Sequence, residues 1–336
     1  MTRLWRVSTR LLRYFEAALP SQFSPGIREI HPPPTVATND EITKPVPKDA
    51  EILIQVHAAG ITGDEITWPE PYNRATRIPG HDISGVVSQL GPNYNGPLKV
   101  GHEIFAMITA DRGEGQAEYA ICTDNEVALK PKSISHAEAA ALPIPLLTAY
   151  EALLDHGGIK SGMRVFITGA SGSVGILAVQ IAKLKFGAHV VGLASAQHHE
   201  TLRKMGADEV FDYKTEGWET QFNKVGLVFD TVGGKVLEKC WKVVEDNGTL
   251  ITVGDPAPSW AFGQGVAPEA VDHPGVRYKH FILSPVSERL NQLGEMIDGG
   301  LVKPLKVEVF PFDDSVKAWA YARQRGRGNK AVISFV

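Results

Sequence analysis

The feature that most constrains the fold of this chain is a glycine-rich turn between a buried strand and an amphipathic helix. The stretch RVFITGASGSVGILAVQIA occupies residues 164–182. Gly172 lets the backbone approach a pyrophosphate, Gly175 lets the helix pack closely on the strand, and the free amides of the helix N-terminus attract phosphates. The spacing of the glycines alone is a weak signal, but the strand and helix on either side support it. We predict a dinucleotide site here; the alternative is a purely structural tight turn.

Strands and helices alternate around this turn, which indicates βαβ units and a parallel sheet with right-handed crossovers. The pattern predicts helices over residues 174–186, 198–205 and 235–244, between strands over residues 164–168, 188–193, 209–211, 227–230 and 249–253. Residues 255–275 are rich in Pro, Gly and Ala and predict a loop, followed by a strand over 278–283, a helix over 286–297 and a β-like tail. This part of the chain is typical of a doubly wound domain.

The region before the turn has a different character. Residues 51–57 alternate apolar and polar side chains as a half-buried strand does, and turn signals recur up to about residue 120. Helices are expected over 136–142, with Ser135 as N-cap, and over 148–154. The chain is therefore expected to be an α/β protein in which 1–145 and 276–336 form a β-rich domain and 146–275 form the doubly wound domain.

Composition excludes several classes of protein. The chain has 34 Lys and Arg against 38 Asp and Glu, a formal net charge of -4, which does not favour binding to nucleic acid or to an anionic membrane. Its two cysteines exclude a disulfide scaffold and a four-cysteine zinc lobe, and fit a reducing compartment. No apolar run approaches the ~18 residues that suggest a spanning helix.

The N-terminal stretch has two interpretations. Arg3, Arg6, Arg10 and Arg13 precede the first acid, Glu16, and would lie on one face of a helix, as in a mitochondrial presequence. The alternative, which we favour, is that part of residues 1–18 forms the first strand of the first domain. We accordingly expect a cytoplasmic protein, with mitochondrial import as the alternative.

The residues after the second strand of the doubly wound domain indicate which dinucleotide binds. NAD-specific domains place an acid about 20 residues after the glycine turn, on the ribose hydroxyls, and here no acid follows the strand until Glu200. Ser195 and Tyr213 are candidate hydrogen-bond donors to a 2′-phosphate, and His198 or Arg203 is a candidate for its counter-charge. We predict NADPH as cofactor; the alternative is an ordinary polar helix start.

With these motifs in order, the chain resembles the medium-chain dehydrogenase/reductase superfamily, in its zinc-independent, ζ-crystallin-like quinone oxidoreductase branch. The resemblance covers nearly the whole chain after about residue 25. It rests on the glycine turn together with HAAGI (57–61), IPGHDISGVV (78–87), LTAYEA (147–152), GADEVFDY (206–213), FDTVGG (229–234) and GNKAVIS (328–334). It implies a GroES-like substrate domain and a Rossmann domain, with the active site between them.

The resemblance also bears on zinc. Where the zinc-dependent branch has its first cysteine ligand this chain has Thr62, the histidine is retained as His81, and residues 141–147 contain no cysteine. One ligand of three does not hold zinc tightly, so we expect no catalytic metal. Without a Lewis acid, hydride must go to an acceptor activated by conjugation, a quinone or an α,β-unsaturated carbonyl.

The positions that match the family supply the expected site residues. Thr62, Tyr72 and His81 are the expected donors to the acceptor's carbonyl oxygen, and Thr148 is expected beside the nicotinamide carboxamide. The full set of expected cofactor-binding residues is Thr148, Ala170, Ser171, Gly172, Ser173, Val174, Gly175, Ser195, His198, Tyr213, Val232, Gly254, Ile282 and Asn329.

Two other functions remain open. One is an enoyl reductase acting on a thioester-bound intermediate, with the loop 255–275 shaping a wider cleft. The other is a non-redox role, as an NADPH-binding sensor or cyclase, since the fold is not tied to one function.

The resemblance also bears on the oligomeric state. Family members often dimerise through an edge strand of the Rossmann sheet, for which residues 278–283 are the candidate.

Overall fold

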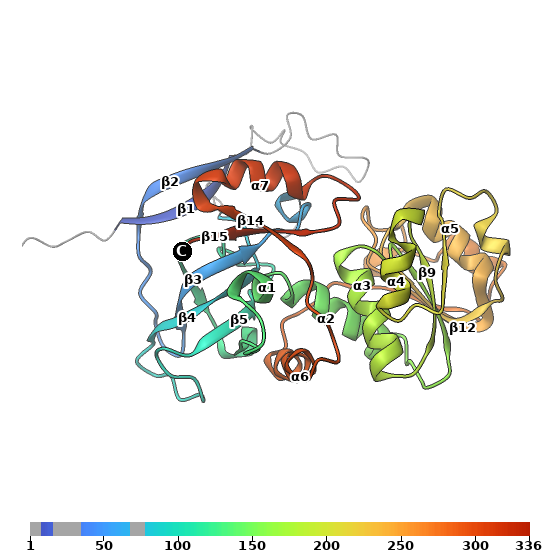
Figure 1. Cartoon of the computed structure of the whole chain (residues 1–336), viewed down its shortest axis with the longest axis horizontal. Helices are drawn as coiled ribbons and strands as arrows, with labels where there is room; N and C mark the ends of the chain where they lie inside the picture. Colours follow the sequence, from blue (N-terminus) through green and yellow to red (C-terminus); the bar gives the residue numbers. More distant parts are fainter. Residues whose placement is uncertain (1–7, 16–34, 68–77) are drawn as a thin grey trace, which may run out of the picture. The chain divides into compact units, whose positions relative to one another are not determined.

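Two sheets organise the protein, one in each of two units. The computed structural model describes residues 8–15, 35–67 and 78–336 (Figure 1). The first unit consists of Met1–Ile144, Ser284–Asp298 and Pro304–Val336, and the second of Pro145–Leu283 and Gly299–Lys303. The return to the first unit comes after residue 283 instead of 275, because the strand at 277–280 pairs with the sheet of the second unit.

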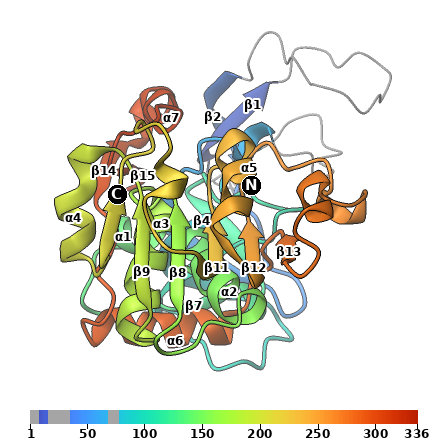
Figure 2. The same cartoon turned by 90° about the vertical axis from the view of Figure 1, so that its right-hand side faces the viewer.

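The second unit is a doubly wound domain. Its parallel strands lie in the order β10 (Glu209–Phe211), β9 (His189–Leu193), β8 (Arg164–Thr168), β11 (Val225–Asp230), β12 (Val244–Thr252) and β13 (Arg277–His280). Figure 2 shows β9, β8, β11 and β12 side by side. Numbered along the chain, this is the 3-2-1-4-5-6 order of dinucleotide-binding domains. The helices of this unit are α2 (Pro143–Glu151), which starts in the first unit, α3 (Ser173–Gln180), α4 (His199–Lys204) and α5 (Gly234–Val243).

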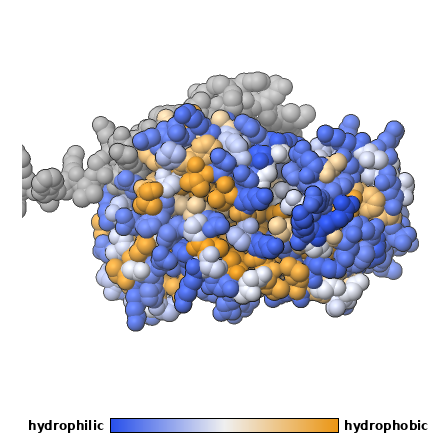
Figure 3. Space-filling view, in the orientation of Figure 1, coloured by the Kyte–Doolittle hydropathy of each residue, from blue (hydrophilic) through white to orange (hydrophobic). Residues whose placement is uncertain are grey.

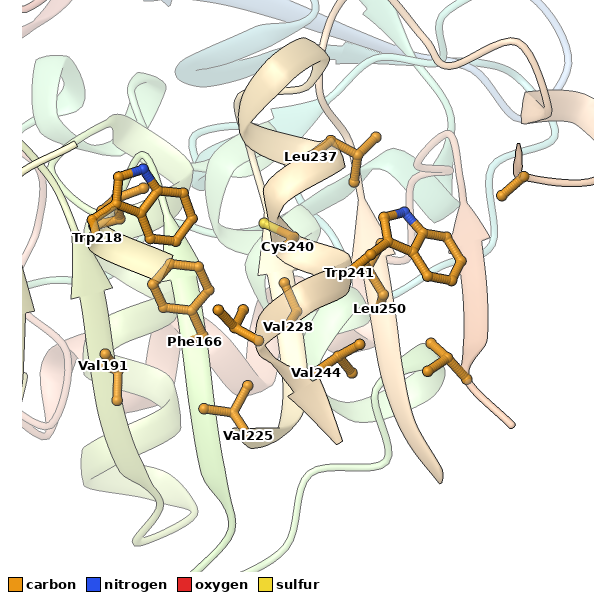
Figure 4. Close-up of a cluster of buried hydrophobic side chains, with 14 of the residues drawn as sticks. Phe166, Val191, Trp218, Val225, Val228, Leu237, Cys240, Trp241, Val244 and Leu250 are labelled. Atoms are coloured by element: carbon orange, nitrogen blue, oxygen red, sulfur yellow. The ribbon is translucent and has the colours of Figure 1, made fainter. Parts of the chain in front are cut away.

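The core of the second unit is rich in aromatic side chains (Figure 4). The Phe166 ring on β8 stacks on Trp218 with 5.5 Å between ring centroids, and Trp241 on α5 meets Tyr278 edge-on at 5.1 Å. Strands β8, β9 and β11 are buried along most of their length, which explains why they appear in the sequence as continuous apolar runs.

The first unit is the β-rich domain. Its main sheet has the order β14 (Val307–Pro311), β15 (Lys330–Ser334), β3 (Ile52–Gly60), β4 (Asp82–Leu90), β5 (Glu103–Met107) and β7 (Val127–Leu129), and β6 (Tyr119–Cys122) also pairs with β3. The helices of this unit are α1 (His136–Ala140), α6 (Ser287–Asp298) and α7 (Ser315–Ala322). Ser135 is the N-cap of α1, as predicted, and exchanges hydrogen bonds with Glu138 in a capping box.

The structure decides between the two interpretations of the N-terminal stretch and differs from the sequence prediction at two helices. Residues Ser8–Phe15 form strand β1, antiparallel to β2 (Thr35–Thr43), so a presequence helix over these residues is wrong and the strand alternative holds there; residues 1–7 and 16–18 lie outside the described ranges. The helix expected at 148–154 already begins at Pro143, because the first turn of a helix needs no proline N–H. Helix α7 was not expected; it buries Ala318, Trp319 and Ala322 in a core with β15.

Hydrophilic side chains cover most of the face shown in Figure 3, with apolar ones in smaller groups among them. No helix within the described ranges is long and apolar enough to span a bilayer.

Candidate functional site

The glycine turn after β8 brings the start of α3 close to the strand. Gly169 adopts φ +55°, a conformation that favours glycine. Gly172, the N-cap of α3, donates its N–H to the Gly169 carbonyl at 2.8 Å. A Cβ on Gly175 would collide with that same carbonyl, so only glycine permits this approach. The first amides of α3 have no acceptor within the helix. The turn therefore fits the phosphates of a dinucleotide.

The predicted cofactor residues follow each strand of this sheet. Because the strands are parallel, their carboxyl ends lie at one edge, which we call the carboxyl edge. The predicted residues that come after successive strands are 170–175 after β8, Ser195 and His198 after β9, Tyr213 after β10, Val232 after β11, Gly254 after β12 and Ile282 after β13. Two predicted residues lie elsewhere: Thr148, 6% exposed, is on α2, and Asn329 belongs to the first unit, where it donates to Glu308.

A buried carboxylate ties three strands together at this edge. Asp230, at the end of β11, accepts hydrogen bonds from the hydroxyls of Thr168 on β8 at 2.6 Å and Thr252 on β12 at 2.7 Å. It also accepts the N–H groups of Val232 and Gly233, at 3.2 and 2.9 Å. Sequence reasoning did not single out Asp230. The available signal was a lone acid at the end of an otherwise apolar strand, three residues before the glycine pair Gly233-Gly234.

The residues expected to select the cofactor have a neighbouring acid that sequence spacing did not reveal. Ser195 and His198 are half-buried, and Tyr213 is 51% exposed. Asp212, which follows β10, accepts the N–H of Ala196 at 3.2 Å and that of Lys214 at 2.9 Å. The Lys214 hydrogen bond, together with that from Ala196, lowers the pKa of Asp212. A carboxylate thus lies beside the Ser195–His198 turn, contributed by the third strand instead of the second.

The first unit contains a second group of chemically active side chains, which we call the polar cluster: Thr62, Glu65, His81, Asp82, Gln116, Trp319 and Lys330. Its members come from segments far apart in the sequence. Glu65 is central: its Oε2 lies 2.9 Å from Nδ1 of His81, and its Oε1 accepts Nε2 of Gln116 at 3.0 Å. The indole of Trp319 on α7 in turn donates to Gln116 Oε1 at 2.9 Å. This half of the cluster is a continuous buried hydrogen-bond network.

The other half of the polar cluster is built around Lys330, the first residue of β15. Its side chain is 4% exposed, and Nζ donates to Thr62 Oγ1 at 3.0 Å. Asp82 Oδ2 lies 4.0 Å from the same Nζ, and Asp82 Oδ1 accepts the backbone N–H of Ile144 at 2.8 Å. Among the described residues, Asp82 Oδ2 has no hydrogen-bond partner.

Burial controls the charge state of this pair. Desolvation raises the pKa of Asp82 to about 7, although the positive charge of Lys330 opposes the shift. Desolvation also lowers the pKa of Lys330, against the attraction of Asp82 and Glu65. Burial by itself would lower the pKa of His81, but the hydrogen bond and charge of Glu65 raise it above the ordinary value. Burial therefore outweighs the partner at Asp82 and Lys330, whereas Glu65 outweighs burial at His81.

The structure brings two of the three predicted catalytic residues into the polar cluster. Thr62 is half-exposed beside Lys330, whereas His81 is 1% exposed and bonds to Glu65 and the Ala110 backbone. Tyr72 lies outside the described residues. Sequence reasoning missed Lys330, Asp82 and Glu65 as members of the site, although Lys330 and Asp82 fall within quoted motifs. For these two the signal was a charged residue at the start of an apolar strand.

The residues at the zinc-ligand positions do not form a metal site. Thr62 offers a hydroxyl that is already bonded to an ammonium group, and His81 is bonded to Glu65. In residues 8–15, 35–67 and 78–336, no three His, Cys, Asp or Glu side chains are grouped so that they could hold a metal ion.

Comparison with known proteins agrees with these features. The family described as "Alcohol dehydrogenase GroES-like domain" matches residues 48–137, and that described as "Zinc-binding dehydrogenase" matches residues 205–333. The chain is 30% identical to the "Probable zinc-binding oxidoreductase, mitochondrial" of Arthroderma benhamiae, over 90% of this chain and 94% of that protein. The chain belongs to the medium-chain dehydrogenase/reductase superfamily. Within it, the chain is a zinc-independent oxidoreductase, although the names of these matches include zinc.

Other members of the superfamily are similar over most of the chain. The 2-methylene-furan-3-one reductase of Solanum lycopersicum is 34% identical, over 85% of this chain and 72% of that protein. The NADPH-dependent alkenal/one oxidoreductase of Arabidopsis thaliana is 30% identical, over 87% and 74%. Among solved structures, the CurK enoyl reductase matches with a TM-score of 0.77 and 25% identity, over 89% of this chain and 95% of that chain. The predicted α/β fold, GroES-like and Rossmann domains and oxidoreductase class are confirmed, with a nicotinamide dinucleotide as cofactor.

Proposed function

We propose that this protein reduces an α,β-unsaturated carbonyl compound or a quinone with NADPH. The observation that carries the proposal is a contrast between the two units: the dinucleotide turn is intact, while the zinc-ligand positions hold Thr62 and a buried His81. Carbonyl reduction without a Lewis acid needs an acceptor whose conjugation already stabilises the added electrons. Relatives named as reductases of such compounds support this choice.

Residues of the carboxyl edge, together with Thr148 on α2, would hold the cofactor, which supplies a hydride from the nicotinamide ring when bound. The α3 amides would bind its pyrophosphate and Thr148 its carboxamide, while Ser195, His198 and Tyr213 would bind the 2′-phosphate of NADPH. Asp212 opposes that phosphate and Lys214 favours it. Calorimetric titration with NADPH and NADH tests the preference: tighter binding of NADPH is expected, and tighter binding of NADH would contradict it.

An acceptor panel tests the reaction itself. We would follow nicotinamide absorbance with EDTA-treated enzyme, NADPH, and ortho-quinones, para-quinones, enones and an acyl thioester. Turnover of an enone or quinone despite EDTA is the expected result. If no acceptor is reduced while NADPH still binds, the proposed reaction is wrong and a non-redox role gains support.

A second candidate is an enoyl reductase acting on an acyl thioester. The similarity to the CurK enoyl reductase favours it, since the same hydride addition to a conjugated carbon would serve a thioester. A thioester turned over faster than every small enone and quinone would select this function.

The assembly and location of the protein are part of the same proposal. Among the described strands, β13 is the last of its sheet and has no strand paired to its outer edge; we propose that this edge pairs with a second copy of the chain in a homodimer. Light scattering that finds a monomer at micromolar concentration would contradict it.

For location we favour the cytosol, with mitochondria as the alternative suggested by the name of the Arthroderma relative. Fluorescent fusions with and without residues 1–18 distinguish the two.

A further inference from the structure

The hydrogen bond between Lys330 and Thr62 determines where the Thr62 proton can point. An ammonium group has three donors and no acceptor, so the Lys330 side chain can only donate. In this contact, 3.0 Å long, Thr62 Oγ1 must therefore be the acceptor. The hydroxyl proton of Thr62 is left for a second partner, and within the described residues it has none.

The burial of Lys330 determines from which side it contacts the Thr62 hydroxyl. Lys330 is the first residue of β15, which pairs with β3, and Thr62 lies two residues beyond the end of β3. Lys330 is buried while Thr62 is half-exposed, so the ammonium group lies behind the hydroxyl and solvent or ligand reaches only the hydroxyl.

The charged groups around Lys330 hold its ammonium group in place and do not accept the hydroxyl proton of Thr62. Asp82 is the nearest carboxylate, at 4.0 Å, and Glu65, Asp64 and Arg327 are the other charged groups that act on Lys330. Asp82 bonds to the Ile144 N–H and not to Thr62. The ammonium group of Lys330 therefore donates to the oxygen of Thr62, and the hydroxyl proton of Thr62 points away from it. A positive charge on the oxygen side strengthens the hydroxyl as a hydrogen-bond donor.

We propose that Lys330 is the positioning residue that makes Thr62 the hydrogen-bond donor to the acceptor's carbonyl oxygen. This inference rests on the proposed function. The acceptor carbon would gain a hydride from NADPH, the electron pair of its double bond would shift to form the enolate double bond, and the carbonyl π pair would move to the oxygen. The resulting enolate or quinol anion would then take a proton from water. Thr62 donates to the oxygen as its charge develops, with Lys330 stabilising that charge from behind.

The decisive variant removes both members of the buried ion pair. Lys330→Met alone leaves Asp82 as an unpaired buried charge and risks unfolding, so the test uses Lys330→Met/Asp82→Asn. We expect kcat with an enone to fall about 100-fold, the range seen when one oxyanion donor is lost, with the dissociation constant for NADPH changed less than about twofold. Thr62→Val should lower kcat by a similar factor, and Thr62→Ser should retain most of it.

Two comparisons separate this role from a structural one. Adding Thr62→Val to Lys330→Met/Asp82→Asn should cause little further loss, because residues that act through one contact are not additive. The matched control is Lys130→Met, since Lys130 is another buried lysine paired with a carboxylate, Glu103, and donates to the carbonyls of Pro131 and Ile134. It should lower stability and leave kcat within about twofold.

The outcomes are distinguishable. If wild-type protein reduces enones and Lys330→Met/Asp82→Asn retains kcat within about threefold, the inference is wrong and the proposed function stands. Losses that multiply when Thr62→Val is added would also overturn it. If the wild-type protein reduces no conjugated acceptor, the proposed function fails and this inference fails with it.

Discussion

The two units present their chemistry in opposite ways. The carboxyl edge of the second unit offers mainly backbone groups, and its main requirement is the absence of side chains at Gly169 and Gly175. The polar cluster of the first unit offers side chains, every one of which depends on a partner distant in the sequence. A backbone site is therefore sensitive to added volume, whereas a side-chain site is sensitive to the loss of a partner or a change of charge.

The largest effect should come from adding volume at the glycine turn. Gly175→Ala places a methyl group against the Gly169 carbonyl, and overpacking of this kind costs about 3 kcal/mol. We expect a lower midpoint in urea unfolding and NADPH binding at least about 100-fold weaker by calorimetry. Gly162→Ala is the control, because a methyl group at Gly162 meets nothing within 4 Å and adds only the strain of a positive φ; an equal loss of binding in that variant would show that the turn is not the cause.

Removing the carboxylate that ties the strands of the carboxyl edge should have the next largest effect. Asp230→Asn replaces one accepting oxygen by an NH₂ group among the donors Thr168, Thr252 and Gly233. An unsatisfied buried group costs about 2 kcal/mol, measurable by urea unfolding. Unchanged stability together with unchanged NADPH affinity would mean that Asp230 does not organise this edge.

The polar cluster should make stability depend on pH through Asp82. The pKa of Asp82 rises from 3.8 to about 7 on folding, so folding takes up a proton between these values and stability falls as pH rises through the window. Asp82→Asn cannot take up that proton. We expect the stability of wild type relative to Asp82→Asn to fall by up to about 1.4 kcal/mol per pH unit. Thermal unfolding at several pH values measures it, and parallel curves would contradict the raised pKa.

The smallest effect should come from Asp212, whose charge lies beside the predicted 2′-phosphate residues. Asp212→Asn keeps an acceptor for one of the N–H groups of Ala196 and Lys214 but removes the negative charge. Solvent and salt screen a charge at this position, so NADPH should bind only a few-fold more tightly and NADH about as before. An equal gain for both cofactors in calorimetry would place Asp212 away from the 2′-phosphate.

Sequence analysis succeeded where neighbouring residues define the structure. The strand at 164–168, the short strand at 209–211 and the Ser135 cap are each specified within a few residues by apolar runs, β-branched side chains and a capping pair. Helix α7 escaped prediction because its amphipathic face is recognised only against β15, whereas the first strand was the favoured interpretation despite arginines at helical spacing.

The sequence by itself determined the two domains, the dinucleotide turn and the replacement of two zinc ligands, because each depends on the identity and spacing of adjacent residues. Only the tertiary structure decided that Lys330 contacts Thr62, that Trp319 donates to Gln116, and that Asp212 approaches Ala196. Such contacts join residues that are brought together by strand pairing and helix packing. They depend on the register of the whole sheet, which no local pattern contains.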